Sequence, residues 1–258
     1  MSGTSTTAPR RFMSHRMKVS LIQVLSLAAF FGIWAYYTGP GGISPLFIAS
    51  IPATASALWD IILDPNTWAA TWTTVFQIIV ALAIALVVGF GIGFYGARSQ
   101  IRLETIEPLV AWGYMVPFVL FYPVLLLWLG VDEMSKIAYG AANGLFPMAL
   151  NTMKGFKSVD KSLVRTARAF GASERQIEWT VKLPSALPVV LTGVRVGAAL
   201  TVITVILAEM LASRRGLGFE LSRASQTLQV PRSYGYIIFI IGIVSVLHFI
   251  IQKIDVRR

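Results

Sequence analysis

The chain has 258 residues, of which 55% are hydrophobic and only 13% are charged, and its mean hydropathy is +0.69. These values are typical of a protein that crosses a membrane several times, and they exclude a soluble domain. The formal net charge of +10 would suggest nucleic acid as the partner of a soluble protein. In a membrane protein, basic residues instead set the orientation and contact anionic lipid, so we expect membrane lipids and no nucleic acid among the partners.

The sequence contains no Cys and only two His, His15 and His248. Without Cys there is no disulfide, no thiolate metal site and no cysteine nucleophile. The two His are too far apart along the chain, one in a basic tail and one in an apolar run, to form a two-His metal site. No constellation of His, Cys or paired acids suggests catalysis either, so we predict neither a metal site nor a catalytic residue.

The chain begins with a basic, Ser- and Thr-rich stretch, residues 1–18, for which we predict a cytoplasmic tail. The apolar run over residues 19–37 is long enough to cross about 30 Å of hydrocarbon. It lacks the Ala-x-Ala exit of a cleaved signal peptide, so we interpret it as a retained span. Residues 39–66 contain four prolines and a short amphipathic piece over residues 53–63, and we expect them at the outer surface.

The apolar runs predict six transmembrane helices in a membrane domain over residues 19–258. Sixteen of the 22 Lys and Arg then lie on the proposed inner side, which is the positive-inside pattern with both termini in the cytoplasm. The expected helices cover residues 19–37, 68–95, 104–129, 136–153, 188–211 and 234–252. Residues 212–233 form an outer segment that contains Gly-Leu-Gly at 216–218.

Glycines and prolines mark the second, third and fourth expected helices. Gly89, Gly91, Gly93 and Gly96 would let a neighbouring helix approach closely. The third helix contains three prolines, and a broken helix is tolerated in a bilayer only where protein or a water-filled cavity satisfies the freed carbonyls. The third helix is therefore our candidate for the wall of a translocation pathway. The fourth helix is rich in small residues, and we expect a break at Pro147.

Six residues are candidates for lining that pathway. Aromatic residues of the third helix could face it, although packing and interfacial roles are open alternatives. Glu209 is the only clearly intramembrane acid, and it could serve a gate or contact a solute, reach the outer surface, or pair with Arg214. The candidates are Trp112, Tyr114, Pro117, Phe118, Asn143 and Glu209.

Residues 154–184 are too highly charged to lie in hydrocarbon, yet their local pattern predicts ordered structure. Apolar residues recur at helical spacing up to Phe170, and Gly171 follows where a left-handed helix cap is expected. Ser173 and Gln176 form a capping-box pattern that begins a second helix. Pro184 should end this helix near Leu183. We therefore predict two short helices joined at Gly171.

This segment has two interpretations. It could be a solvated basic loop, or it could be a docking element for a soluble partner. The large apolar residues Phe170, Ile177 and Trp179 favour docking, because a merely solvated loop has little reason to carry them at helical spacing.

The spacing within this segment resembles a known family. Arg165-Thr166-Ala167, three residues, Gly171, nine residues and then Val-Lys-Leu-Pro at 181–184 are similar to the Glu-Ala-Ala cytoplasmic loop of permease subunits in binding-protein-dependent ABC importers. Arg165 stands where the family has Glu, and Thr166 where it has the first Ala. Residues 117–136 and 187–218 extend the likeness, which is strongest to the nitrate, sulfonate and taurine type.

The resemblance implies an all-α permease of type I ABC importer (MetI-like) architecture in the plasma (inner) membrane. It implies three partners: a second permease copy in a homodimer, a cytoplasmic ABC ATPase dimer that binds ATP and Mg²⁺, and an extracytoplasmic solute-binding protein. It implies no cofactor in this chain. The residues that would couple to the ATPase are Arg165, Ala167, Phe170, Gly171, Ala172, Ser173, Leu183 and Pro184.

The sequence has no GxxxxGK[ST] phosphate-binding loop, so we predict that this chain does not hydrolyse ATP. An ion-coupled secondary transporter or channel is the alternative. Such carriers usually place several acids, His or broken-helix carbonyls at mid-membrane, whereas Glu209 stands alone here and off the midplane. We therefore expect a permease subunit that is driven from outside itself and carries a small polar solute.

Overall fold

The computed structural model describes residues 15–253, so most of the predicted tail and the last five residues lie outside the described part. Within it every regular element is a helix. Residues 15–18, expected in the tail, already belong to the first helix. The elements are α1 (His15–Thr38), α2 (Ile51–Leu63), α3 (Pro65–Ala97), α4 (Gln100–Met115), the 3₁₀ turn η1 (Phe118–Phe121), α5 (Tyr122–Leu129), α6 (Glu133–Lys157), α7 (Lys161–Ala169), α8 (Glu174–Gln176), the π turn η2 (Ile177–Lys182), α9 (Leu183–Leu211), α10 (Leu217–Gln226) and α11 (Val230–Lys253).

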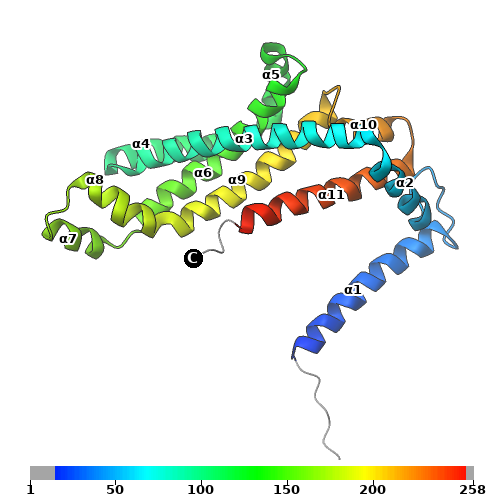
Figure 1. Ribbon diagram of the computed structural model, residues 1–258, viewed down its shortest axis with the longest axis horizontal. Coiled ribbons are helices and arrows are strands. Elements are labelled where there is room, and N and C mark those ends of the chain that lie inside the picture. Colours follow the sequence, from blue (N-terminus) through cyan, green and yellow to red (C-terminus); the bar gives the residue numbers. More distant parts are fainter. Residues whose placement is uncertain (1–14, 254–258) are drawn as a thin grey trace, which may run out of the picture.

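The centre of the bundle is α6, which packs along its length between α3 and α9 (Figure 1). Small residues make this close approach possible. A Cβ added at Gly93 of α3 would lie 2.5 Å from Thr152 Cβ, and one added at Gly193 of α9 would lie 2.5 Å from Asn151 Cβ. The prediction that glycines bring helices together is therefore confirmed for Gly89, Gly93 and Gly96, whereas Gly91 faces open space.

The first helix, α1, stands apart from this core and diverges from it in Figure 1. Its attachment lies at its C-terminal end, where the Trp34 indole donates a hydrogen bond of 2.8 Å to the Ala49 carbonyl. The same indole ring packs against Tyr234 of α11. The amphipathic helix α2, which was expected in this region, packs on α11.

Four described helices are long and apolar enough to cross a membrane: Arg16–Thr38, Pro65–Ala97, Glu174–Leu211 and Val230–Ile250. A fifth crossing is possible if Gln100–Met115 and Phe118–Leu129 together form one bent span. The fourth helix expected from sequence, α6, has 25 residues but is not among them. Length and composition therefore identify four or five candidate spans among the described helices.

The third expected helix, residues 104–129, is broken, as its prolines predicted, and its two pieces meet at an angle of 77°. The break falls at Val116 and Pro117, as expected for a proline that restricts its predecessor. Pro108 lies inside α4 without ending it, and Pro123 occupies the first turn of α5, where its missing amide proton costs nothing. Of three expected kinks, one separates the helices.

Two other predictions about proline are wrong. Pro147 does not break α6, which continues to Lys157 while enclosed by α3 and α9. Pro184 does not end a helix either, because residues 174–211 are helical without interruption. We infer that the π turn η2, which immediately precedes Pro184, is the reason. The Leu183 amide donates to the carbonyl of Glu178, five residues earlier, and this wider spacing of the backbone accommodates the proline ring.

The outer segment at residues 212–233 also holds a helix, α10, that the sequence did not predict.

Candidate functional site: the elbow between α7 and α8

Helices α7 and α8 form an elbow that projects from one end of the bundle, beyond the ends of α3 and α6 (Figure 1). The elbow begins at Asp160, whose carboxylate accepts a hydrogen bond of 2.7 Å from the Ser162 amide and so caps α7. This backbone hydrogen bond lowers the pKa of the Asp160 carboxyl, and the charge of Arg165 contributes in the same direction. The start of the elbow is therefore fixed by local contacts.

The end of α7 is closed by a Schellman motif. The Gly171 amide donates to the Arg168 carbonyl at 3.0 Å, and the Ala172 amide donates to the Ala167 carbonyl at 3.1 Å. Gly171 has φ = +80°, a conformation that only glycine adopts without strain, and an added Cβ would meet nothing within 4 Å. The glycine is required here by the backbone angle and not by crowding.

The second half of the elbow begins with the predicted capping box. The Ser173 hydroxyl accepts from the Gln176 amide, while the Ser173 amide donates to Gln176 Oε1 at 2.8 Å. Arg168 and Glu174 form an ion pair of 2.6 Å across the bend. Both side chains are more than half exposed, so the pair contributes little to stability. The caps therefore hold the shape of the elbow.

The apolar residues that suggested docking do not all face outward. Phe170, at the tip, is 87% exposed and Leu163 is 48% exposed. Ile177 is fully buried, and the ring of Trp179 lies 5.6 Å from that of Phe94 in α3. Ile177 thus supports the elbow from inside, which corrects its interpretation as a docking residue. Trp179 contacts Phe94 yet is 49% exposed, so Phe170, Leu163 and one face of Trp179 remain available to a partner.

Several contacts join the elbow to the bundle. Arg98, at the end of α3, forms an ion pair of 2.9 Å with Glu178, and its guanidinium lies 4.9 Å from the Phe94 ring. Leu183 packs against the buried cluster of Phe156, Ala186 and Val190 between α6 and α9. The elbow is therefore attached to α3, α6 and α9.

The structure brings six of the eight predicted coupling residues together at the elbow. Arg165, Phe170, Gly171 and Ser173 are exposed, while Ala167 and Ala172 are partly buried. Leu183 and Pro184 lie farther along, in the first turn of α9. Their role toward an ATPase stays a prediction.

The six pathway candidates do not form one site within the single chain. Trp112 and Tyr114 are exposed on α4, and Pro117 is exposed at the bend. Phe118 lines an apolar hollow of about 370 Å³ in the angle between α4 and α5, together with Phe121 and Phe146. Asn143 is partly buried, and its amide donates to the Tyr139 carbonyl of its own helix at 3.0 Å. Their pathway role also stays a prediction.

Glu209 has a different environment from those considered from the sequence. It is fully buried, and its carboxylate accepts hydrogen bonds of 2.8 Å from the Thr74 hydroxyl and the Gly218 amide. The Thr74 hydroxyl oxygen in turn accepts a hydrogen bond of 2.8 Å from the Leu217 amide. Glu209 and Thr74 together satisfy the first free amides of α10, and these contacts fix α10 to α9 and α3. Among the described contacts, the partners of Glu209 are thus Thr74 and Gly218, and not Arg214.

Sequence reasoning missed Thr74 and the role of Gly-Leu-Gly at 216–218. An added Cβ at Gly218 would lie 2.8 Å from Glu209 Cβ, so the glycines let the start of α10 reach the carboxylate. The one available signal was an intramembrane acid followed closely by two glycines. Thr74 lies 135 residues away from Glu209 and gave no signal.

Residues 89–257 match the family model described as "Binding-protein-dependent transport system inner membrane component". The taurine transport system permease protein TauC of Escherichia coli K12 is 32% identical over 57% of this chain and 52% of that protein. The putative aliphatic sulfonates transport permease protein SsuC of the same strain is 38% identical over 44% of this chain and 43% of the relative. The chain thus spans about half the length of these relatives.

A longer match is to the riboflavin transport system permease protein RibX of Chloroflexus aurantiacus, 32% identical over 72% of this chain and 70% of that protein. Among solved structures, the MetNI methionine ABC transporter in an inward-facing conformation has a chain with a TM-score of 0.60 at 19% identity. The match covers 74% of this chain and 94% of that one, and it establishes the fold. The resemblance to sulfonate- and taurine-type permeases, the MetI-like all-α fold and the multi-pass inner-membrane location are confirmed. The chain therefore belongs to the family of binding-protein-dependent transport system inner membrane components.

Proposed function

We propose that this chain is the permease subunit of an ATP-driven importer for a small polar solute of the sulfonate or taurine kind. A solute-binding protein delivers the solute from outside, and a dimer of cytoplasmic ABC ATPases, which bind ATP and Mg²⁺, supplies the energy. The observation that carries this proposal is the elbow, because its capped bend presents Phe170, an aromatic residue that is almost fully exposed.

The elbow suits the transmission of force. Its second half continues without interruption into α9, a helical run of 38 residues from Glu174 to Leu211. The ion pair between Arg98 and Glu178 and the ring contact between Phe94 and Trp179 join the same run to α3. An ATPase that holds Phe170 in a cleft would therefore move α3 and α9 together when it closes.

We propose that α6 is the sixth span. Its 25 residues reach roughly 37 Å, enough to cross the hydrocarbon. It is polar for a membrane helix, but its polar groups are satisfied within the protein: Asn143, Asn151 and Thr152 each donate to a carbonyl one turn earlier. A helix enclosed by neighbours tolerates such residues where a lipid-facing helix does not. Six spans place both termini on the elbow side, in the cytoplasm.

We further propose that a second copy of this chain covers the faces of α4 and α5. Large apolar side chains lie unpartnered there, with Trp112 exposed by 72%, Leu127 by 84% and Trp128 by 77%. The hollow beside Phe118 lies on this face and would receive side chains of the second copy. The bent α4–α5 pair of each copy would then line a path between the two, in agreement with the predicted pathway wall.

The contacts of Glu209 count against the ion-coupled alternative. The only acid considered for ion coupling accepts hydrogen bonds that hold α10 in place, so it has no evident exchange with water. Glu209 therefore does not supply the acidic site that such a carrier requires.

Reconstitution tests the proposal. The chain is incorporated into vesicles with its ATPase and binding protein, and uptake of labelled taurine and ethanesulfonate is measured with ATP, without ATP, and with an ATPase whose catalytic Glu is replaced. Uptake should require ATP, the active ATPase and the binding protein. Accumulation by the chain alone under an ion gradient, or labelling of residues 160–180 from the outside, would overturn the proposal.

A further inference from the structure

A polar cavity of about 450 Å³ lies at the end of the bundle opposite the elbow. It is a half-open cavity bordered by α3, by the connection from α5 into α6, and by the connection between α9 and α10. This volume suits a small organic solute. The residues that line it are Gln77, Val131, Asp132, Glu133, Met134, Lys136, Ser213, Arg214 and Arg215.

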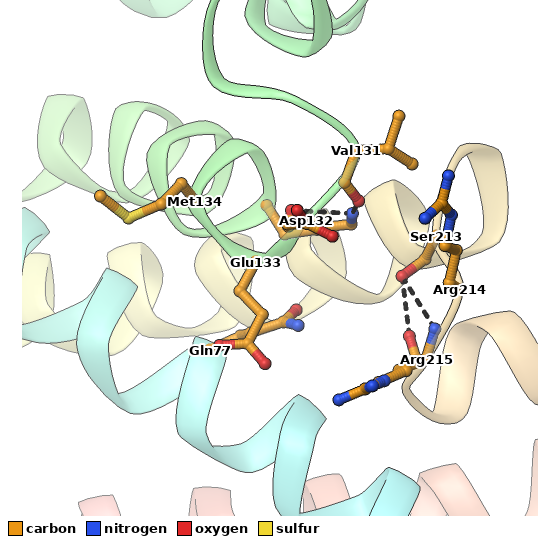
Figure 2. Close-up of a pocket in the computed structure, with 9 residues that line it drawn as sticks. Gln77, Val131, Asp132, Glu133, Met134, Ser213, Arg214 and Arg215 are labelled. Atoms are coloured by element: carbon orange, nitrogen blue, oxygen red, sulfur yellow. Dashed lines mark hydrogen bonds between the residues drawn. The ribbon is translucent and has the colours of Figure 1, made fainter.

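Charges of opposite sign lie on different walls of this cavity. Figure 2 shows Glu133 on one side and Arg214 and Arg215 on the other, with Asp132 between them at the α6 end. Within residues 15–253 none of these four side chains takes part in an ion pair. Both kinds of charge are therefore available to a ligand.

Lys136, the remaining charged residue, is not available in this way. It is 1% exposed, and its ammonium group donates to the carbonyls of Val131 and Asp132. These bonds close the connection between α5 and α6. Arg214 and Arg215 are therefore the residues that could bind an anion in the cavity. The turn that carries them is stabilised by a hydrogen bond of 2.7 Å, which the Ser213 hydroxyl donates to the Arg215 carbonyl.

The floor of the cavity carries an acceptor without a donor. Gln77 of α3 is 1% exposed, and its Oε1 atom makes no hydrogen bond among the described residues. Figure 2 shows its amide extending beneath Glu133 toward the side of the cavity that carries Arg215. A buried oxygen of this kind is normally satisfied, so its position indicates a ligand or water that supplies an N–H or O–H group.

We propose that this cavity is an outer binding site for a small zwitterion. The sulfonate or carboxylate of the solute lies against Arg214 and Arg215, and its ammonium group lies against Asp132, Glu133 and Gln77 Oε1. A simple anion would face the two acids unpaired, and a simple cation would face the two arginines. A zwitterion is the class that satisfies both walls and the orphan acceptor.

This inference rests on the proposed function, since a solute on its way inward must first enter at the outer face. It assigns the choice between solutes in part to the permease itself. The position of the cavity beside α10 also places the bound solute next to the helix that Glu209 and Thr74 hold.

Direct binding to the permease–ATPase complex in nanodiscs, without the binding protein, tests the inference. The ligands are three zwitterions (taurine, β-alanine and glycine), ethanesulfonate, which lacks the amine, and ethylamine, which lacks the anion. At least one zwitterion should bind roughly tenfold more tightly than either singly charged compound.

Variants separate the two ends of the site. Glu133→Gln and Gln77→Leu should weaken zwitterion binding roughly tenfold and leave ethanesulfonate binding unchanged or stronger, whereas Arg215→Gln should weaken both. Arg223→Gln is the matched control, because Arg223 pairs with Glu220 at the same end of the protein but does not line the cavity. Thermal transitions and ATPase rates show that each variant is folded.

Two results would overturn the inference. In the first, no zwitterion binds better than the singly charged compounds. In the second, the variants leave direct binding of the zwitterion unchanged and lower uptake only because the solute-binding protein attaches less tightly to the permease. The second result would identify a docking surface instead. Neither result contradicts the proposed function. The proposed function would fail on a different result, namely no ATP-dependent uptake by vesicles that contain the wild-type chain and all its partners.

Discussion

The guanidinium of Arg98 lies 2.9 Å from the carboxylate of Glu178 and joins the end of α3 to the π turn below the elbow. The Glu178 side chain is 15% exposed and that of Arg98 is 44% exposed, so water screens the pair only in part. The two residues belong to the elements that the proposed mechanism moves together. Their contact therefore has a consequence for coupling.

Reversing one charge, in Arg98→Glu, should lower the number of solute molecules carried per ATP hydrolysed severalfold, because two carboxylates then repel at the joint. The double variant Arg98→Glu with Glu178→Arg should restore much of the ratio. Lys157→Glu is the control, since Lys157 pairs with Glu107 at 3.9 Å on α4 and not on the elbow. Equal effects of the single and the double variant would argue against a role for the pair.

Gly171→Val should uncouple ATP hydrolysis from uptake. A β-branched residue at φ = +80° is strained by about 1–3 kcal/mol, which opens the Schellman motif and shifts the elbow. Gly42→Val is the matched control, because Gly42 has φ = +69° and open space but lies in the connection between α1 and α2. Normal uptake by the Gly171 variant at a normal ATPase rate would contradict the proposed role of the elbow.

Phe170→Ala should leave the fold unchanged, because the side chain is 87% exposed, but should weaken binding of the ATPase about tenfold. The measurement is the dissociation constant of permease and ATPase in detergent. Phe47→Ala provides the control, since Phe47 is 76% exposed and precedes α2, far from the elbow. A similar loss in both variants would indicate a general surface effect.

Glu209→Leu should destabilise the protein by about 1.5–3 kcal/mol, because the Thr74 hydroxyl and the Gly218 amide lose a charged acceptor. Hydrogen exchange at the amides of Leu217 and Gly218 should accelerate before the rest of the chain does. Glu209→Gln retains one acceptor oxygen, and it should keep ATP-driven uptake. Complete loss of uptake in this folded variant would instead support a direct role in the gate or pathway.

Gly93→Ala should destabilise the bundle by about 1–3 kcal/mol, since its Cβ would lie 2.6 Å from the Ala149 carbonyl oxygen. The helix α6 cannot move away from α3 to relieve this contact, because α9 packs on its other side. Gly91→Ala, two residues earlier on α3, meets nothing within 4 Å and should be neutral or slightly stabilising. Thermal unfolding of the purified variants in one detergent measures the difference. Equal stability would contradict the packing described here.

The elbow could be predicted almost completely from sequence, because its determinants act within a few residues. Gly171 supplies the left-handed cap, and Ser173 and Gln176 form the capping box; both features follow from the local sequence pattern. The apolar spans were likewise predictable from run length, and the helix starts and ends differ from the prediction by only a few residues except around Pro184.

Only the tertiary structure decided the features that depend on residues far apart in the chain. Pro147 stays within a helix because α3 and α9 enclose α6, and Glu209 is buried because Thr74 and the start of α10 provide its donors. The cavity that joins Gln77 to Glu133 and Arg215 has no local pattern at all. Hydrophobic runs and caps are properties of a segment, whereas burial of a charge and the shape of a cavity are properties of neighbours that folding brings together.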